Sequence, residues 1–360
     1  MAAFRIFGIS LVVTVAALAV GYAHGGLEDL FLLLVLAVLE VSLSFDNAII
    51  NAAILKRMSR VWRQMFLTIG ILVAVFGMRL LFPLLLVWGT AGLDPVRAME
   101  LALHPPPHGA LEFPDGSPSY EKLIASAHPQ IAAFGGIFLL MLFLDFVFYD
   151  RDIKWLKWIE TPFARIGRLA QVSVAVAVLA LILVGTQLTH SAEERATVLT
   201  AGLFGLVTYL IVNGFSRAFR PPDSEGATTG QAVGKAGLML FLYLEVLDAA
   251  FSFDGVTGAF AITSDPIVIA LGLGLVGSMF VRSITIYLVQ QDALDRYVYL
   301  EHGAHWAIGA LAVIMLASID PRFEVPEPIT ASVGVVFIGA ALSWSVRRNR
   351  RQARAAVPAG

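Results

Sequence analysis

The chain has 360 residues, of which 58% are hydrophobic and only 14% are charged. Soluble domains average about 45–50% apolar and about 25% charged residues, so this composition excludes a soluble enzyme and a disordered chain. The net charge of −2 removes the basic signature of a nucleic-acid-binding protein. Without cysteine there are no disulfides, no thiolate metal sites and no cysteine nucleophile. A multi-span membrane protein remains.

Apolar runs long enough to cross the hydrocarbon core as helices, about 20 residues each, recur along the chain. They predict an all-α, polytopic membrane protein with about ten transmembrane helices. In chain order the predicted spans are 4–22, 28–52, 64–88, 130–149, 170–188, 196–215, 236–261, 266–289, 304–319 and 329–346. The first run also fits a second interpretation, a signal peptide with small residues at a cleavage site near Gly21.

Positive charge is distributed unequally between the two sides of this predicted topology. Of the 25 Lys and Arg residues, 19 fall in the N-terminal segment, the even-numbered loops and the C-terminal tail, and 4 fall in the opposite loops. Cytoplasmic segments carry such an excess. We therefore expect a protein of the cytoplasmic membrane with both termini in the cytoplasm, and an outer loop at 89–129 that is rich in proline.

Two predicted spans carry related motifs. The tripeptide Ser-Phe-Asp occupies 44–46 and recurs at 252–254, and a carboxylate stands six residues before the aspartate in each copy, at Glu40 and Asp248. The tripeptide alone could recur by chance. A tripeptide together with a carboxylate at the same distance is much less expected by chance. The pattern predicts an internal repeat.

The following span in each half contains one arginine, Arg79 in the first and Arg282 in the second. This predicts two repeats of five helices, over 1–190 and 191–346, followed by a basic cytoplasmic tail at 347–360. Because each unit has an odd number of spans, the second repeat is inverted relative to the first. In secondary transporters with inverted repeats the substrate site lies near the bilayer midplane.

Five carboxylates fall well inside the predicted spans, where each costs about 2.5–3.5 kcal/mol at a helix centre. They could form buried ion pairs that fix helix packing, or they could hold a cation, which their excess over the two arginines favours. Oxygen ligands suit Mg²⁺, Ca²⁺ and Mn²⁺. The candidate metal ligands are Glu40, Asp46, Asn47, Glu245, Asp248 and Asp254, with Ser44, Asn51, Arg79, Ser252 and Arg282 in support.

Helical spacing places most of these side chains on two stripes, with Asp46 and Asp254 off the stripes. Either each aspartate faces a second packed helix, or each helix unwinds there, which would also expose carbonyl oxygens. A second group near the inner helix ends, including His302 and His305, could line a vestibule or be ordinary interfacial residues.

The motif at Glu40 to Asn47 resembles the Glu-x-x-Leu-Ser-x-Asp-Asn signature of the TerC family, within the wider LysE-like transporter group. The stretch from Glu245 to Asp254 resembles that family's second signature, although Gly255 and the two residues after it depart from its usual Ser-Ile-Pro. The resemblance extends over about 28–320. It implies metal binding by Asp46, Asn47 and Asp254 with Glu40, Glu245 and Asp248, and an association with manganese export and tellurium resistance.

These patterns together predict a non-enzymatic secondary transporter that exports a divalent cation, with Mn²⁺ the leading candidate. No cofactor is expected to be bound permanently, and protons are a candidate coupling ion. Three alternatives remain: a non-transporting membrane scaffold or metal-stress factor, an amino-acid exporter, and an intramembrane aspartyl protease. The protease lacks its Gly-x-Gly-Asp signature, because Gly272-Leu273-Gly274 is followed by Leu275.

Overall fold

The structure is a computed structural model that describes residues 2–70, 72–73, 96–97, 100–101, 104, 106, 110–218, 232–263 and 265–355. Within these ranges every regular secondary-structure element is a helix. β-Pairing within them is limited to isolated bridges at Met58–Ala232 and Glu112–Pro118. The prediction of an all-α fold is confirmed. Predicted spans fall on helices wherever they are described, and 64–88 lies mostly outside the described residues.

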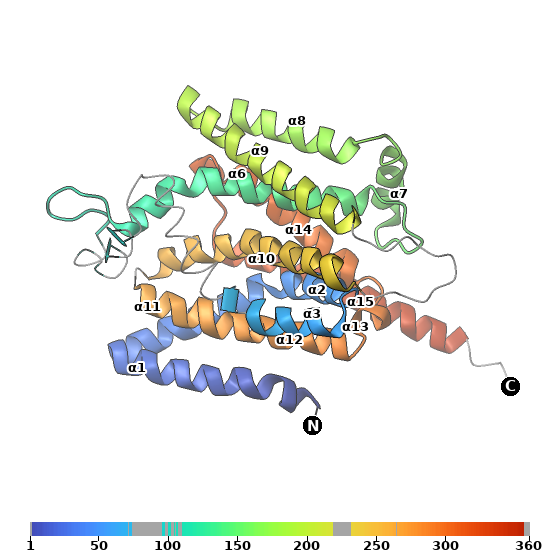
Figure 1. The fold of residues 1–360 in the computed structure, drawn as a ribbon, viewed down its shortest axis with the longest axis horizontal. Helices are drawn as coiled ribbons and strands as arrows, with labels where there is room; N and C mark the ends of the chain where they lie inside the picture. Colours follow the sequence, from blue (N-terminus) through green and yellow to red (C-terminus); the bar gives the residue numbers. More distant parts are fainter. Residues whose placement is uncertain are drawn as a thin grey trace. The chain divides into compact units, whose positions relative to one another are not determined.

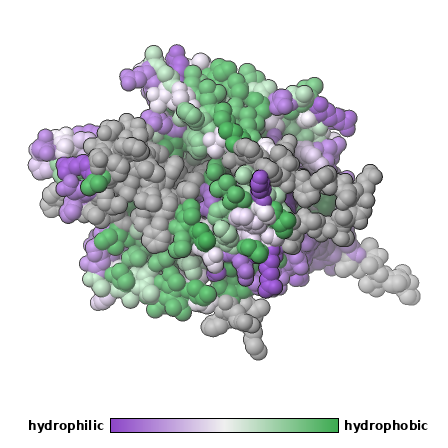
Figure 2. All heavy atoms as spheres, in the orientation of Figure 1, coloured by the Kyte–Doolittle hydropathy of each residue, from purple (hydrophilic) through white to green (hydrophobic). Residues whose placement is uncertain are grey.

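Several of these helices are long and apolar enough to cross a membrane. Five segments of the described chain qualify: Ile6–Val41, Tyr120–Val147, Ala192–Ile211, Ile267–Gln290 and Leu300–Ala317. Shorter apolar helices occupy Phe45–Leu55 and Val172–Gln187. Large apolar side chains lie exposed on the surface, among them Leu183 and Phe204, and Figure 2 shows apolar atoms gathered in broad patches. The chain is therefore a multi-pass α-helical membrane protein.

The chain divides into two compact units, and each takes residues from both predicted repeats. The first comprises Met1–Ser44, Arg57–Ala132 and Val212–Ile284, and the second comprises Phe45–Lys56, Ala133–Ile211 and Thr285–Gly360. The repeat boundaries inferred from sequence remain predictions.

In the first unit, α1 (Ala2–Leu43) packs along a π-helical segment, η4 (Ala270–Gly277). In Figure 1 this segment lies in the helix between the labels α11 and α12, beside α1. Their shared core contains Leu33, Leu36 and Leu273, each fully buried. The helix α1 contains a break at Gly25 and Gly26, whose backbone angles are not helical. The described helical segments of this unit are α1 (Ala2–Leu43), α3 (Arg60–Met65), η1 (Phe66–Gly70), the start of α6 (Tyr120–Val147), the end of α9 (Ala192–Ala218), α10 (Gly234–Ile262), α11 (Pro266–Ile269), η4 (Ala270–Gly277) and the start of α12 (Ser278–Gln290).

In the second unit, glycines allow the helices to approach closely. A Cβ added at Gly205 would lie 2.3 Å from the carbonyl oxygen of Phe134, and one at Gly303 would lie 2.5 Å from Ala341 Cβ. The helical segments of this unit are α2 (Phe45–Leu55), most of α6 (Tyr120–Val147), α7 (Lys157–Ile166), α8 (Val172–Gln187), most of α9 (Ala192–Ala218), the end of α12, α13 (Ala293–Arg296), α14 (Leu300–Ala317), η5 (Pro321–Phe323) and α15 (Glu327–Ala355).

Candidate cation site

The first motif copy lies where α1 passes into α2. The helix is interrupted for one residue at Ser44, since α1 ends at Leu43 and α2 begins at Phe45. Glu40 is buried, with 1% of its surface exposed, and it accepts a hydrogen bond of 2.6 Å from Ser44 Oγ. In this copy the helix is therefore interrupted beside the aspartate, as one of the two sequence interpretations proposed.

Asp46 occupies the first turn of α2, where backbone N–H groups lack intrahelical partners and the helix dipole favours negative charge. Its Oδ1 accepts a hydrogen bond of 2.8 Å from the backbone N–H of Asn47. Asn47 and Asn51 are also buried on α2. The Asn51 side-chain oxygen has no hydrogen-bond partner among the described residues. This oxygen is therefore available to coordinate a cation.

The second motif copy lies on a continuous helix. α10 runs from Gly234 to Ile262 through Asp254 without a break, so here the helix does not unwind. Glu245 and Asp248 are both buried and stand three residues apart on this helix, where side chains are neighbours. Neither carboxylate oxygen of Glu245 has a hydrogen-bond partner in the described part of the chain. Two carboxylates this close repel each other when both are charged, and a proton or a cation nearby relieves that repulsion.

The glutamates of the two copies make matching contacts in the first unit. A Cβ added at Gly277 would lie 2.1 Å from Glu40 Cγ, and one at Gly70 would lie 2.6 Å from Glu245 Oε1. Gly70 lies in the π-helix η1, and Gly277 is the last residue of the π-helix η4. Glu40 of the first copy thus lies against Gly277, in the span after the second copy. Glu245 of the second copy lies against Gly70, in the span after the first copy. Alignment on Ser-Phe-Asp pairs Glu40 with Asp248, so Glu245 makes its contact one helical turn earlier.

The supporting residues are placed unevenly. Arg282 donates a hydrogen bond of 2.8 Å from Nε to the carbonyl oxygen of Leu67, so among described residues its partner is backbone rather than a motif carboxylate. Arg79 and the side chains of Ser252 and Asp254 lie outside what the structure describes.

A further buried carboxylate, which sequence patterns did not indicate, lies in the second unit. Four nitrogen atoms surround Glu160 on α7: the backbone N–H groups of Trp155 and Leu156 at 3.0 and 3.3 Å, and His302 Nδ1 and Trp306 Nε1 at 3.2 Å each. Burial opposes its charge, but these partners outweigh burial and hold the pKa of Glu160 below its ordinary value. This cluster joins α7 to α14.

The two histidines of α14 belong to this packed region. His302 is 5% and His305 7% exposed, and the ring of His305 stacks on Phe146 with centroids 3.7 Å apart. Arg151 lies over the same phenylalanine ring, 4.0 Å from its centroid. Through these contacts both histidines pack against neighbouring side chains near the N-terminal end of α14.

Sequence patterns also gave no indication of Gly70 and Gly277 as part of the site. A signal was present, since the two glycines stand 207 residues apart, close to the 208 that separates Asp46 from Asp254. A further group that the motifs left out, His24 with Asp29 and Asp265, converges at the break in α1.

A helical protein that crosses the membrane several times and buries carboxylates inside its helices is the class that this fold and these side chains define. Within that class, the chain belongs to the DUF475 family, described as "Protein of unknown function (DUF475)", whose profile matches residues 45–352. Neither a curated protein nor a solved structure matches the chain.

Proposed function

We propose that this protein is a secondary transporter that exports a divalent metal cation, with Mn²⁺ the leading candidate, across the cytoplasmic membrane. The observation that carries the proposal is Glu245, whose two buried oxygens have no hydrogen-bond partner among the described residues, beside the buried Asp248. A buried carboxylate without donors is costly unless a cation or proton neutralises it. A transported divalent ion supplies that charge and leaves again.

The paired contacts of the motif glutamates support the inverted repeat on which the proposal depends. Glu40 lies against Gly277 and Glu245 against Gly70, so each half supplies both a carboxylate and the glycine that receives the other carboxylate. Such exchange is expected of two related halves that face each other around one axis. Both glycines lie in π-helical segments, which are frequent at functional sites.

Mn²⁺ is favoured by the oxygen-rich donor set and by the resemblance of the two motifs to TerC signatures. Mg²⁺ and Ca²⁺ also take oxygen ligands, so the donor set alone leaves them as competitors. Protons are the proposed coupling ion, because carboxylates that bind a metal must release protons and can take them up again when the metal leaves. Both termini are placed in the cytoplasm by the distribution of basic residues.

The test is uptake into proteoliposomes that contain the full chain, with Mn²⁺, Mg²⁺, Ca²⁺ and Zn²⁺ compared under an imposed pH gradient. We expect saturable Mn²⁺ movement in the wild type and a loss of roughly tenfold or more in Glu245→Gln, in line with the 10–100-fold that even outer partners of metal ligands contribute. Glu160→Gln is the matched control, because it removes a buried carboxylate charge elsewhere.

Absence of cation movement for all four ions would refute the proposal. Equal rates in the wild type and Glu245→Gln would refute the assigned site. A scaffold predicts that Asp46→Asn and Glu245→Gln leave any cellular metal-resistance phenotype unchanged.

A further inference from the structure

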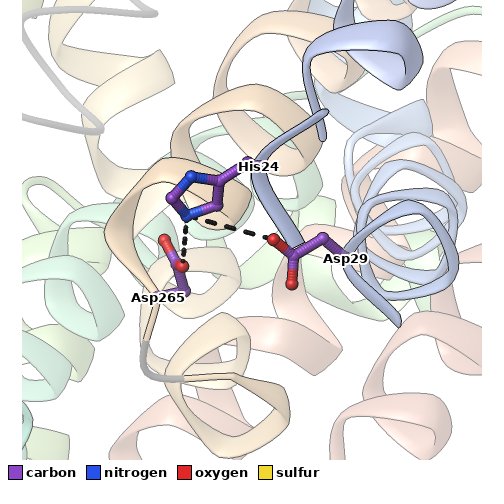
Figure 3. Close-up of side chains that lie close together, drawn as sticks. All are labelled: His24, Asp29 and Asp265. Atoms are coloured by element: carbon purple, nitrogen blue, oxygen red, sulfur yellow. Dashed lines mark hydrogen bonds and ion pairs between the residues drawn. The ribbon is translucent and has the colours of Figure 1, made fainter. Parts of the chain in front are cut away.

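Three potential metal ligands from separate segments meet where α1 is broken. His24 ends the first arm of α1, Asp29 lies in its second arm, and Asp265 directly precedes α11. His24 Nε2 lies 2.9 Å from Asp265 Oδ2 and 3.9 Å from Asp29 Oδ2 (Figure 3), and the three donor atoms all lie within 4.8 Å of one another. All three residues belong to the first unit.

The glycine pair at the break is what brings Asp29 into the group. A Cβ added at Gly25 would lie 2.1 Å from Asp29 Oδ2 and 2.3 Å from its Cγ, so any other residue there would displace the carboxylate. Gly26 has φ of 73°, a left-handed conformation that side chains other than glycine rarely adopt. The turn thus places a second carboxylate beside an imidazole that already has one.

Asp265 is oriented by the backbone that follows it. Its Oδ1 accepts hydrogen bonds from the N–H groups of Ile267 at 2.7 Å and Val268 at 3.3 Å. With one oxygen fixed in this way, Oδ2 is directed at His24. A structural link between the two segments would need only the pair of His24 and Asp265. Such a link does not explain why a glycine turn also brings Asp29 beside His24.

One imidazole nitrogen and two carboxylate oxygens are a ligand set for a divalent transition metal. Imidazole and carboxylate together suit Mn²⁺, Zn²⁺ and related ions, whereas Ca²⁺ and Mg²⁺ take oxygen ligands. Donors bound to one such ion at about 2.0–2.2 Å stand roughly 3–4 Å apart. The two separations from His24 fall close to that range.

We propose that His24, Asp29 and Asp265 form a second metal site, accessible from solvent, that binds a divalent transition-metal ion through one nitrogen and two oxygen atoms. The site is distinct from the motif carboxylates and needs no transport activity. In the proposed ten-span topology, the segments between the first two spans and between the seventh and eighth both face outward. This placement alone rests on the proposed function, and it would put the site where an exported ion emerges.

The nitrogen ligand gives the site a spectroscopic signature that the motif carboxylates lack. Mn²⁺ is added to the full chain in lipid nanodiscs, and pulsed electron paramagnetic resonance detects the modulation from a directly bound ¹⁴N nucleus. We expect this modulation in the wild type and its loss in His24→Gln. The affinity of His24→Gln for the Mn²⁺ ion that gives the modulation should be at least tenfold weaker than that of the wild type. His104→Gln is the matched control, since His104 is exposed and its Nδ1 lies 3.1 Å from a carbonyl of its own segment.

Asp265→Asn guards against a folding defect, because asparagine still caps α11. This variant should keep the thermal stability of the wild type while its Mn²⁺ affinity falls. Nitrogen modulation and affinity that are unchanged in both His24→Gln and Asp265→Asn would overturn the site. Glu245→Gln separates the two proposals: it should keep the nitrogen signal, and if it also keeps every bound Mn²⁺ ion, the transport site fails while this site stands.

Discussion

Glu160 and Glu245 are both buried, with 4% and 6% of their surfaces exposed, yet their surroundings differ completely. Four nitrogen atoms lie within 3.3 Å of the Glu160 carboxylate. Within the described residues the Glu245 carboxylate has no such partner and has Asp248 one turn away. Glu160 belongs to the second unit and Glu245 to the first.

This difference separates a carboxylate with a structural role from the carboxylate that we propose as a cation ligand. A buried charge whose lone pairs all meet donors stabilises a single packing arrangement, and its removal leaves those donors unsatisfied. A buried charge without donors destabilises the empty protein and gains most from an arriving cation. Burial alone therefore does not single out a candidate cation ligand, whereas burial combined with missing donors makes Glu245 the candidate in the proposed site.

The largest expected difference between the two glutamates is in stabilisation by Mn²⁺. Wild-type protein in detergent should gain about 2.7 kcal/mol at a Mn²⁺ concentration 100 times the dissociation constant. Glu245→Gln should lose the part of this gain that the motif site supplies and keep only what the proposed site at His24 contributes, and Glu160→Gln should gain as much as the wild type. Thermal unfolding with and without Mn²⁺ measures these gains. Equal gains in both variants would break the comparison.

In the absence of metal, the two sites should respond to mutation with opposite signs. Glu160→Ala should lower the free energy of unfolding by about 1.5–3 kcal/mol, because hydrogen bonds to a charged acceptor are lost and donors remain buried. Glu245→Gln should leave stability unchanged or raise it, because an uncompensated charge disappears. Thermal or denaturant unfolding in metal-free detergent tests both signs. Glu160→Gln, which keeps one acceptor oxygen, should cost less than Glu160→Ala.

The glycines that receive the motif glutamates should tolerate alanine unequally. At Gly277 the added Cβ meets Cγ and Cβ of Glu40, at 2.1 and 2.7 Å, close to the root of the side chain. At Gly70 it meets the tip of Glu245, which can rotate away. We expect Gly277→Ala to cost about 1–2 kcal/mol and Gly70→Ala less.

Gly8→Ala is the matched control for these two substitutions, because nothing lies within 4 Å of a Cβ added there. It should be neutral or stabilise the helix by about 0.5–1 kcal/mol. Unfolding measurements that rank Gly70→Ala as costlier than Gly277→Ala would contradict the contacts described above.

The smallest expected effect is on pH dependence, and it concerns Glu160. Its pKa in the folded protein is lowered by its partners, from an ordinary value of 4.5, so its contribution to stability is complete above pH 4.5 and is lost as the pH falls below it. The stability difference between wild type and Glu160→Gln should therefore shrink as acid is added below pH 4.5. A difference that stays constant between pH 6 and pH 3.5 would contradict the assigned partners.

Much of the helical architecture follows from sequence because a bilayer leaves few alternatives. Apolar runs must be helical to satisfy their backbone groups, so the predicted spans coincide with helices wherever they are described. The burial of Glu40, Asp46, Glu245 and Asp248 could be anticipated for the same reason. A charge inside an apolar run has no other location than the protein interior.

The details that distinguish the two motif copies could not be anticipated. Both copies read Ser-Phe-Asp, yet one helix is interrupted at Ser44 and the other continues through Asp254. The side-chain partners of Glu160 come from α14, more than 140 residues later in the chain, and no local pattern connects them. The convergence of His24 with Asp265 likewise joins segments 241 residues apart.

The break at Gly25 and Gly26 also bears on the predicted topology, in which this stretch crosses the bilayer twice. The apolar stretch Ile6–Val41 has 36 residues, and as one straight helix it would be about 54 Å long at 1.5 Å per residue. The hydrocarbon core is only about 30 Å thick. Divided at the glycines, residues 6–24 would be about 28 Å long and residues 27–41 about 22 Å long, so the first arm matches the core and the second falls short of it. In the proposed ten-span topology, a pair of residues without side chains thus turns one helix that is too long into two crossings, and reverses the direction in which the chain enters the next span.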